Sequence, residues 1–237
     1  MRILRSKKLI FFAILLIMVA AFAVRFYHYH DWLYFKMDQA RDALLTSHAI
    51  ENGPGYLPLL GPRAGATEVA SGYLRLGPAF YYFQYLAGKI FGSSAPDVLA
   101  YPDLFFSIAV LPLLYLFLRI YFSRFISLLA VAMYAFSFLI IQYSRFAWNP
   151  NSLPFFASLC FYGLLKFLND EDRKRKKWWL ALWATGLFIG SQLHFIGFFT
   201  LLGVSALMLA IHYKIWQKEK IKTYAQKSNL KKIILAA

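Results

Sequence analysis

Two carboxylates and an arginine stand close together in one short stretch, Phe35–Ala43, which reads FKMDQARDA. Asp38 and Asp42 are four residues apart and Arg41 follows Asp38 by three, so a helix would place them on one side. A carboxylate can act as a general base on a hydroxyl or amine, and an arginine can hold a phosphate with two hydrogen bonds. The pattern favours transfer of a group from a phosphate, although the solvated face of an interfacial helix would look the same.

Two later stretches add polar groups of the same kinds. The segment SRFAWNPNS, Ser144–Ser152, contains Arg145 and Asn149, and the segment SQLHF contains His194. An arginine beside an apolar run often reaches along it to the membrane surface, and a histidine between two helices often satisfies backbone groups. Ionisable residues at membrane depth are costly to keep, so a functional role is the working hypothesis for these side chains.

The composition indicates a membrane protein. Of the 237 residues, 60% are hydrophobic and 19% aromatic, and the mean hydropathy is +0.51, which leaves too little polar surface for a soluble globular protein. The net charge of +15 comes from basic residues clustered beside apolar runs, a pattern typical of membrane topology and not of nucleic-acid binding. Cys160 is the single cysteine, so an intrachain disulfide and a cysteine metal site are both excluded.

The first membrane span is predicted over Leu9–Val24. Basic residues precede this uncharged run, which indicates that the N-terminus lies inside. A signal peptide cleaved after Ala23 is the alternative interpretation. The span is favoured because further apolar runs follow and this one can anchor itself.

A long polar and aromatic segment, Arg25–Tyr101, follows the first span and is expected to lie outside. Within it, Met37–Ile50 is predicted to be a helix, because acidic residues lie in its first turn and an Asn-Gly-Pro sequence follows its end. The Gly- and Pro-rich stretch Pro54–Gly72 is predicted to be an irregular loop of the kind that often carries function.

A second helix, Pro78–Phe91, is predicted to lie flat on the membrane. It would rise only about 21 Å at ~1.5 Å per residue, against a hydrocarbon core of about 30 Å, and it contains Lys89 among many aromatic residues. A flat helix leaves most of the 26 basic residues on the cytoplasmic side, whereas a spanning one would invert every later segment. The positive-inside rule therefore selects the flat arrangement.

The predicted fold class is all-α: a polytopic transmembrane bundle of about six spans with two juxtamembrane helices in its long first external loop. The chain ends in a basic pair and an apolar run, so residues 1–237 are expected to be one module that continues in a longer protein. The later spans are expected at Leu104–Leu118, Phe125–Tyr143 and Leu153–Leu168, and as two helices in Trp178–Tyr213 that divide near Gln192–Phe195.

Four stretches resemble, in order and spacing, bacterial membrane glycosyltransferases of the type-C fold: FKMDQARDAL, LGPAFYYF, YSRFAWNPNSLPFF and SQLHF. The chain looks like the N-terminal part of a family 39 member, similar to protein O-mannosyltransferases and aminoarabinose transferases. The resemblance implies inverting transfer of a sugar from a polyprenyl-phosphate donor to a lipid, glycan or protein acceptor outside the cytoplasmic membrane. It also implies two juxtamembrane helices in the first external loop.

The resemblance assigns roles to residues that match its motifs. Asp38 matches the acidic residue of the first-loop motif, the expected base, and Arg145 matches the second-loop arginine, the expected ligand of the donor phosphate. Gln39, Asn149 and Asn151 stand where relatives often carry acids, so no metal and no other cofactor is expected. The further substrate-binding residues expected on the same face are Arg41, Asp42, Arg63, Asn149 and His194.

Two other functions remain open. A transporter or flippase of a lipid-linked substrate would favour internal repeats and charges in mid-span, and the sequence has neither feature. An inactive membrane scaffold fragment is the third interpretation. The basic runs at 173–177 and beyond Lys214 are expected to bind anionic membrane lipids weakly.

Overall fold

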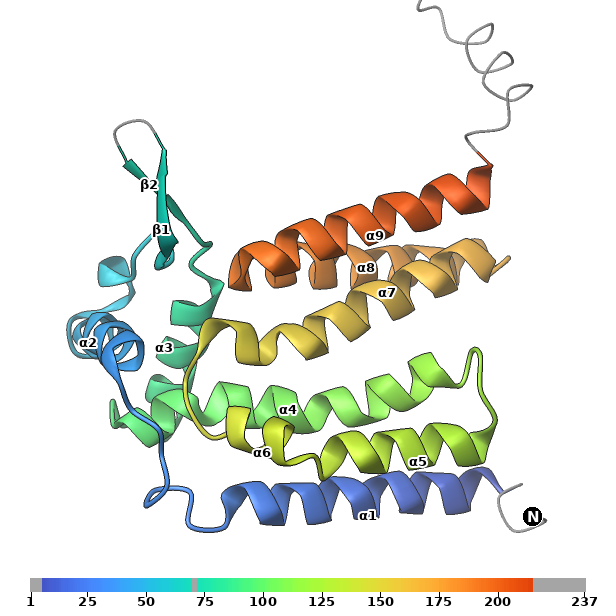
Figure 1. The fold of residues 1–237 in the computed structure, drawn as a ribbon, viewed down its shortest axis with the longest axis horizontal. Helices are drawn as coiled ribbons and strands as arrows, with labels where there is room; N and C mark the ends of the chain where they lie inside the picture. The colour runs from blue at the N-terminus through green and yellow to red at the C-terminus, as the bar shows by residue number, and fades with distance from the viewer. Residues whose placement is uncertain (1–5, 70–71, 215–237) are drawn as a thin grey trace, which may run out of the picture. The chain divides into compact units, whose positions relative to one another are not determined.

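The computed structural model describes residues 6–69 and 72–214, and nearly all of their regular structure is helical. The chain divides after Leu201 into two compact units. This boundary falls within the last described helix, Phe195–Tyr213. In chain order the elements, drawn in Figure 1, are α1 (Lys7–Phe26), α2 (Met37–Asn52), the 3-10 turn η2 (Pro54–Tyr56), β1 (Arg63–Val69), β2 (Gly72–Arg75), α3 (Ala79–Phe91), α4 (Pro96–Leu118), α5 (Arg124–Ala135), α6 (Phe138–Tyr143), the 3-10 turn η3 (Asn149–Ser152), α7 (Leu153–Asn169), α8 (Arg173–Leu193) and α9 (Phe195–Tyr213).

Four of the described helices are long and apolar enough to cross a membrane: α1, α4, α7 together with η3, and α9. The predicted all-α, polytopic membrane fold is confirmed. The other two spans expected from the sequence are not among these four helices. α8 is 21 residues long but begins in a basic run, and α5 has only 12 residues.

The predicted span Phe125–Tyr143 is wrong as one continuous helix, because it is interrupted after Ala135. The Arg25 guanidinium, at the end of α1, donates a hydrogen bond of 2.8 Å to the carbonyl oxygen of Ala135. A backbone carbonyl released from a helix within a membrane needs such an internal donor. Arg25 therefore stabilises the break between α5 and α6 from a distant part of the chain.

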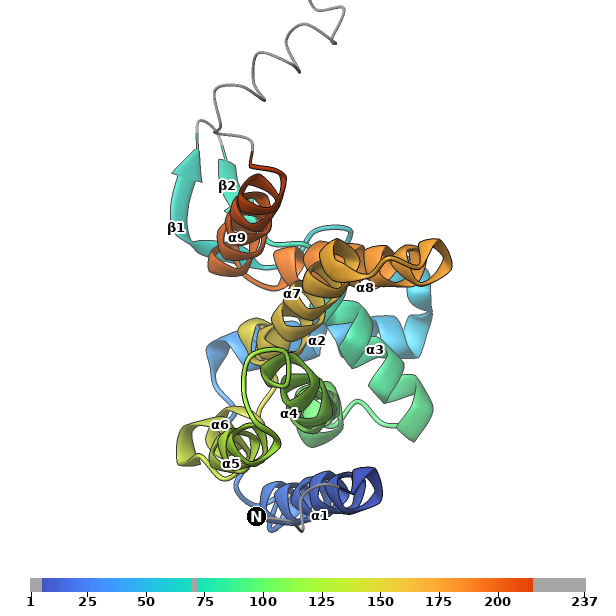
Figure 2. The ribbon, with the colours of Figure 1, turned by 90° about the vertical axis from the view of Figure 1, so that its right-hand side faces the viewer.

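α2 and α3 run across the direction of the long helices at one end of the first unit (Figures 1 and 2). The predicted helices Met37–Ile50 and Pro78–Phe91 are both confirmed to within two residues at each end. Thr46 on α2 donates a hydrogen bond of 3.1 Å to Gln84 on α3, and both side chains are fully buried. A crosswise pair of this kind is expected of helices that lie along a membrane surface.

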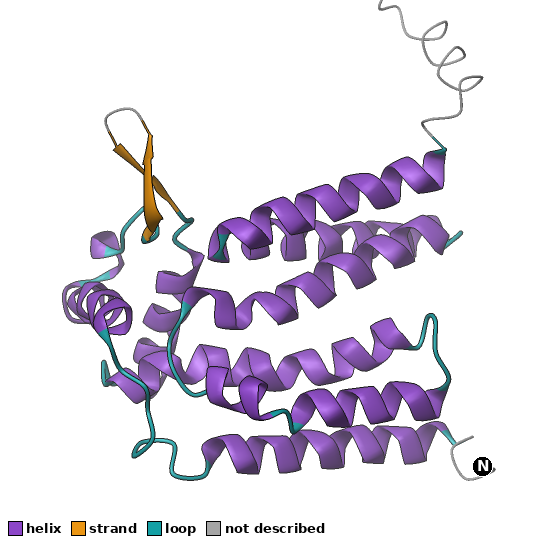
Figure 3. Ribbon diagram, in the orientation of Figure 1, coloured by secondary structure: helices purple, strands orange, loops and turns teal. Residues whose placement is uncertain are grey.

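The stretch Pro54–Gly72, predicted to be irregular, instead begins with η2 and continues into an antiparallel β-hairpin (Figure 3). Arg63 lies opposite Arg75 at the open end of the hairpin. The Arg63 guanidinium carbon lies 3.1 Å from the centre of the Tyr73 ring, a cation–π contact that ties the two strands together. The Gly- and Pro-rich composition that suggested a loop does not reveal this cross-strand contact.

The helix predicted at Leu104–Leu118 begins about two turns earlier, at Pro96. Proline suits the first turn of a helix, and Asp97 places a negative charge there, where the helix dipole stabilises it. The first residues of α4 therefore overlap the segment Arg25–Tyr101, which is expected to lie outside. This start also brings Asp103 into the helix, where that residue is 1% exposed.

Glycines allow α7 and α8 to pack with their backbones almost in contact. A Cβ atom added to Gly186 of α8 would lie 2.5 Å from the backbone nitrogen of Cys160 on α7. A Cβ atom added to Gly163 of α7 would lie 2.6 Å from the backbone nitrogen of Trp183 on α8. Small residues commonly permit such close approach between membrane helices.

The division of the last apolar run near Gln192–Phe195 is confirmed, because His194 alone separates α8 from α9. The backbone N–H of Gly77 donates a hydrogen bond of 3.1 Å to the carbonyl oxygen of Gln192. A Cβ atom on Gly77 would lie 2.3 Å from the Gln192 side chain. The segment before α3 therefore packs closely on the end of α8, beside His194.

Candidate active site

Side chains from separate parts of the chain line one cavity of about 380 Å³. We call it the acidic–basic cavity, because a carboxylate and two arginines line it. It brings together five of the seven site residues predicted from the sequence. α2 contributes Asp38 and Arg41, β1 contributes Arg63, η3 contributes Asn149, and the junction of α8 and α9 contributes His194. The other lining residues are Pro62, Ala64, Gly65, Leu76, Trp148, Pro150 and Phe195.

Arg41 is held between the two carboxylates of its own helix. Its NH1 group lies 3.0 Å from Asp38 Oδ1, and its Nε and NH2 groups each lie 2.8 Å from Asp42 Oδ1. Asp42 is 1% exposed, and the buried Tyr81 of α3 donates a hydrogen bond of 3.2 Å to it. The Asp38 side chain, by contrast, is 59% exposed, so Asp38 faces the cavity and Asp42 lies behind Arg41.

Burial and the neighbouring charge of Arg41 shift the pKa of Asp42 in opposite directions. Burial raises the pKa of the Asp42 carboxyl, although the hydrogen bond and charge of Arg41 and the hydroxyl of Tyr81 oppose the shift. Burial, reinforced by the neighbouring Asp42, raises the pKa of Tyr81. Tyr81 therefore remains a protonated donor at neutral pH.

We expect the stability of Asp42→Asn relative to the wild type to increase with pH. Because the pKa of Asp42 is raised from 3.8 in the folded protein, the folded state binds this proton more tightly than the unfolded chain. The stability that the proton contributes is present at low pH and is lost as the pH rises through the raised pKa. Asparagine cannot ionise, so the Tm of the variant relative to wild type should increase in a thermal-shift assay as the pH rises from the acid range to neutrality.

A matched control for Asp42→Asn is Asp31→Asn, since the Asp31 side chain is 66% exposed. Its Tm difference from wild type should stay within one degree or so at every pH, because an exposed carboxylate contributes little. A Tm difference for Asp42→Asn that does not change with pH would contradict the effect of burial.

Asn149 and His194 both line the cavity and both carry hydrogen-bond donors. Asn149 is 3% exposed, and its Nδ2 group is buried without a hydrogen-bond partner among the described residues. A buried, unpaired amide is costly and points to a missing partner. His194 Nδ1 accepts the Ile196 N–H at 3.1 Å, so the neutral ring carries its proton on Nε2. Both groups could donate to the oxygen atoms of a ligand.

Arg145 does not line the acidic–basic cavity. Its NH1 group donates 2.8 Å hydrogen bonds to the carbonyl oxygens of Arg25 and Tyr27, and its NH2 group donates one of 2.8 Å to that of His28. His28 has a φ of 47°, in the left-handed region that non-glycine residues rarely adopt. Arg145 therefore fixes the turn that follows α1. Burial lowers the pKa of Arg145. The residue lines a different cavity, of about 850 Å³, beside Trp32.

We expect Arg145→Lys to lower the free energy of unfolding by about 2–3 kcal/mol, because the single ammonium nitrogen of lysine cannot reproduce bonds that two guanidinium nitrogens make to three carbonyl groups. Thermal unfolding of the purified variant measures this loss. The predicted role of Arg145 as a phosphate ligand stays a prediction. A variant with wild-type Tm but a raised donor KM would favour that role over the structural one.

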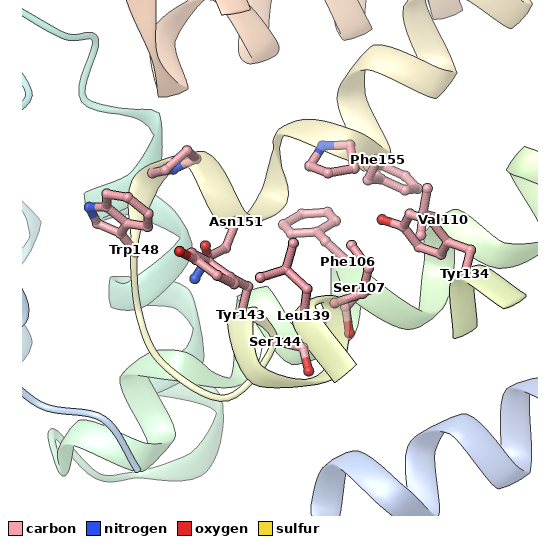
Figure 4. A pocket seen from close by; sticks show the side chains of 13 residues that line it. Phe106, Ser107, Val110, Tyr134, Leu139, Tyr143, Ser144, Trp148, Asn151 and Phe155 are labelled. Atoms are coloured by element: carbon pink, nitrogen blue, oxygen red, sulfur yellow. The ribbon is translucent and has the colours of Figure 1, made fainter. Parts of the chain in front are cut away.

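Sequence reasoning assigned no role at the site to Asp103, Tyr81 or Trp148. Trp148 and Pro150 line both the acidic–basic cavity and a second, largely apolar cavity of about 220 Å³. Figure 4 shows that second cavity, with Trp148 at one end and Val110 and Tyr134 at the other. The WNP sequence, next to a polar motif, was the available signal for Trp148. An aspartate immediately before an apolar run was the signal for Asp103.

Among residues 6–69 and 72–214, no three His, Cys, Asp or Glu side chains gather closely enough to hold a metal ion. The acidic–basic cavity combines one exposed carboxylate with two arginines. That combination suits an anionic ligand, since a guanidinium binds phosphate or carboxylate groups well.

A largely helical chain with several membrane-length helices and this charged cavity defines a multi-pass membrane protein with a candidate site at one end of its bundle. The family model of dolichyl-phosphate-mannose-protein mannosyltransferases matches residues 66–236, and the chain belongs to this family. The resemblance inferred from the sequence motifs is thereby confirmed. The searches of curated proteins and of solved structures found no match.

Membership of the family supports a membrane glycosyltransferase that uses polyprenyl-phosphate sugar donors. The matched region includes Asn149 and His194 and begins after Asp38, Arg41 and Arg63. The part of the cavity contributed by α2 therefore lies outside the matched region.

Proposed function

We propose that the full-length protein transfers a sugar from a polyprenyl-phosphate donor to an acceptor outside the cytoplasmic membrane, with inversion at the sugar and Asp38 as the base. The observation that carries the proposal is the acidic–basic cavity. It combines an exposed carboxylate with Arg41, Arg63 and a histidine that offers a donor.

The reaction is a single displacement. An acceptor hydroxyl attacks the anomeric carbon, its proton passes to the Asp38 carboxylate, and the bond between that carbon and the phosphate oxygen breaks. The polyprenyl phosphate leaves with the bonding electron pair. A positioned base lowers the barrier to such an attack, and nearby cations stabilise the charge that develops on the leaving group.

Side chains that line the cavity are suited to the phosphate, the sugar and the acceptor of this reaction. The guanidinium groups of Arg41 and Arg63 are suited to the phosphate, because they can form paired hydrogen bonds with its oxygens. The unpaired amide of Asn149 is suited to a sugar hydroxyl, which would supply its missing partner. The acceptor, whether lipid, glycan or protein, would approach Asp38.

The proposed sidedness rests on the distribution of charge. The basic run that begins α8 lies at one end of its helix, and His194 follows the other end. If the basic run faces the cytoplasm, as the positive-inside rule predicts, the cavity faces outside and the N-terminus lies inside.

An assay in oriented vesicles tests both the function and the sidedness. The full-length protein is reconstituted, and a panel of polyprenyl-phosphate sugars is supplied with candidate acceptors either outside or inside the vesicles. We expect a glycosylated product when the acceptor is on the same side of the membrane as the cavity. Labelling of a Tyr34→Cys variant with an impermeant reagent identifies that side. Movement of the donor across the membrane without any product would favour a flippase instead.

A further inference from the structure

Asp103 is a buried carboxylate that the proposed reaction does not use. It lies on α4 and is 1% exposed. Its Oδ2 atom accepts the backbone N–H of Trp148 at 2.9 Å, and its Oδ1 atom accepts the hydroxyl of Ser152. Both donors are more than 40 residues away in the chain, so these bonds join α4 to the segment that precedes α7.

The two donors stand at the ends of the short turn η3. Trp148 is the residue before η3, and Ser152 is the residue before α7. Asp103 therefore holds both ends of η3 from another helix, through one backbone N–H and one side-chain hydroxyl. Buried polar groups of this kind need partners inside the protein.

The segment held in this way carries part of the acidic–basic cavity. Trp148, Asn149 and Pro150 all line it, and Asn149 brings the unpaired amide. A displacement of about 1 Å in a substrate-positioning group can lower a reaction rate by roughly 100-fold. The contact between Asp103 and the segment is therefore placed to control the geometry of the cavity.

We propose that Asp103 is a positioning residue that fixes the segment Trp148–Ser152 at the candidate active site, acting through its two hydrogen bonds and not through its charge. The proposal rests on the proposed function for its effect on transfer. Its geometric part can be measured without any catalysis.

Two substitutions separate the hydrogen bonds from the charge. Asparagine keeps an oxygen that can accept the Trp148 N–H, and its amide can donate to the Ser152 hydroxyl, so Asp103→Asn preserves both links without a charge. Leucine has a similar size but leaves both donors buried and unpaired. Ser152→Ala removes one link and provides a milder change. Ser107→Ala is the control, because that buried hydroxyl of α4 bonds to its own helix at Leu104.

The experiment measures kcat and donor KM for the full-length protein, together with maleimide labelling of an Asn149→Cys variant. Native Cys160 is fully buried. Labelling of the protein without the Asn149→Cys substitution therefore gives the background. We expect Asp103→Asn and Ser107→Ala to keep kcat/KM within about 3-fold and to leave position 149 protected. Asp103→Leu should lower kcat/KM by about 100-fold and expose position 149, with Ser152→Ala intermediate in both measurements.

Equal loss of transfer in Asp103→Asn and Asp103→Leu would overturn the proposal, because the charge would then be what matters. Protection of position 149 in both Asp103→Leu and Ser152→Ala would also overturn it. If Asp103→Leu does not fold, Ser152→Ala decides the outcome alone. A protein that transfers no sugar but shows the expected labelling would remove the proposed function and support the positioning role.

Discussion

Asp38→Asn in the full-length protein is expected to lower kcat/KM for sugar transfer by about 10²- to 10⁴-fold, the usual contribution of a general base. The asparagine oxygen can still accept a hydrogen bond from Arg41, which lies 3.0 Å from Asp38 Oδ1, so the local structure is retained. Because the side chain is 59% exposed, folding does not depend on its burial. Transfer is measured with the donor that gives a product in the vesicle assay, and insertion by protease protection.

The control for Asp38→Asn is again Asp31→Asn. Asp31 is 66% exposed and pairs with His28, but it is not among the residues that line the acidic–basic cavity. The control should transfer sugar at the wild-type rate. Full activity in the Asp38 variant would remove Asp38 as the base, and failure of that variant to insert would give it a structural role instead.

Gly186→Val is expected to produce the second large effect, a loss of about 3 kcal/mol in the free energy of unfolding, or roughly 6–12 °C in Tm. The new Cβ atom would lie 2.5 Å from the backbone nitrogen of Cys160 and 2.7 Å from the carbonyl oxygen of Phe156. Backbone atoms of a helix cannot move aside as the end of a flexible side chain can. α7 and α8 must therefore separate.

Gly203→Val is the matched control, because a Cβ atom on Gly203 would meet no atom within 4 Å. Its Tm should stay close to that of the wild type. Separation of α7 from α8 also moves His194, which follows α8 and lines the cavity, so transfer should fall in Gly186→Val even at low temperature. A wild-type Tm for Gly186→Val would show that the close packing of these helices is absent in the membrane.

The positions of most helices could be predicted from the sequence, because they depend on residues that are neighbours along the chain. Apolar runs, an acidic first turn and Gly or Pro at the ends located α2, α3 and the division at His194. The distribution of basic residues also grouped Asp38, Arg63, Asn149 and His194 on one face. These residues do line one cavity.

The sequence did not reveal which of two similar side chains would be accessible. Asp38 and Asp42 share a helix face by spacing, yet α3 covers Asp42 with Tyr81 and leaves Asp38 exposed. This difference depends on the packing of a second helix. The spacing within α2 contains no information about that packing.

Only the tertiary structure decided the break between α5 and α6, the position of Arg145 away from Asp38, and the role of Asp103. In each case a charged side chain bonds to backbone groups far away in the chain: Arg25 to Ala135, Arg145 to the end of α1, and Asp103 to Trp148. Buried backbone groups must find partners somewhere, but local sequence does not show where those partners come from. The sequence by itself therefore determined an all-helical membrane protein and the chemistry of its charged residues, and the fold decided which of those charges meet at the candidate site.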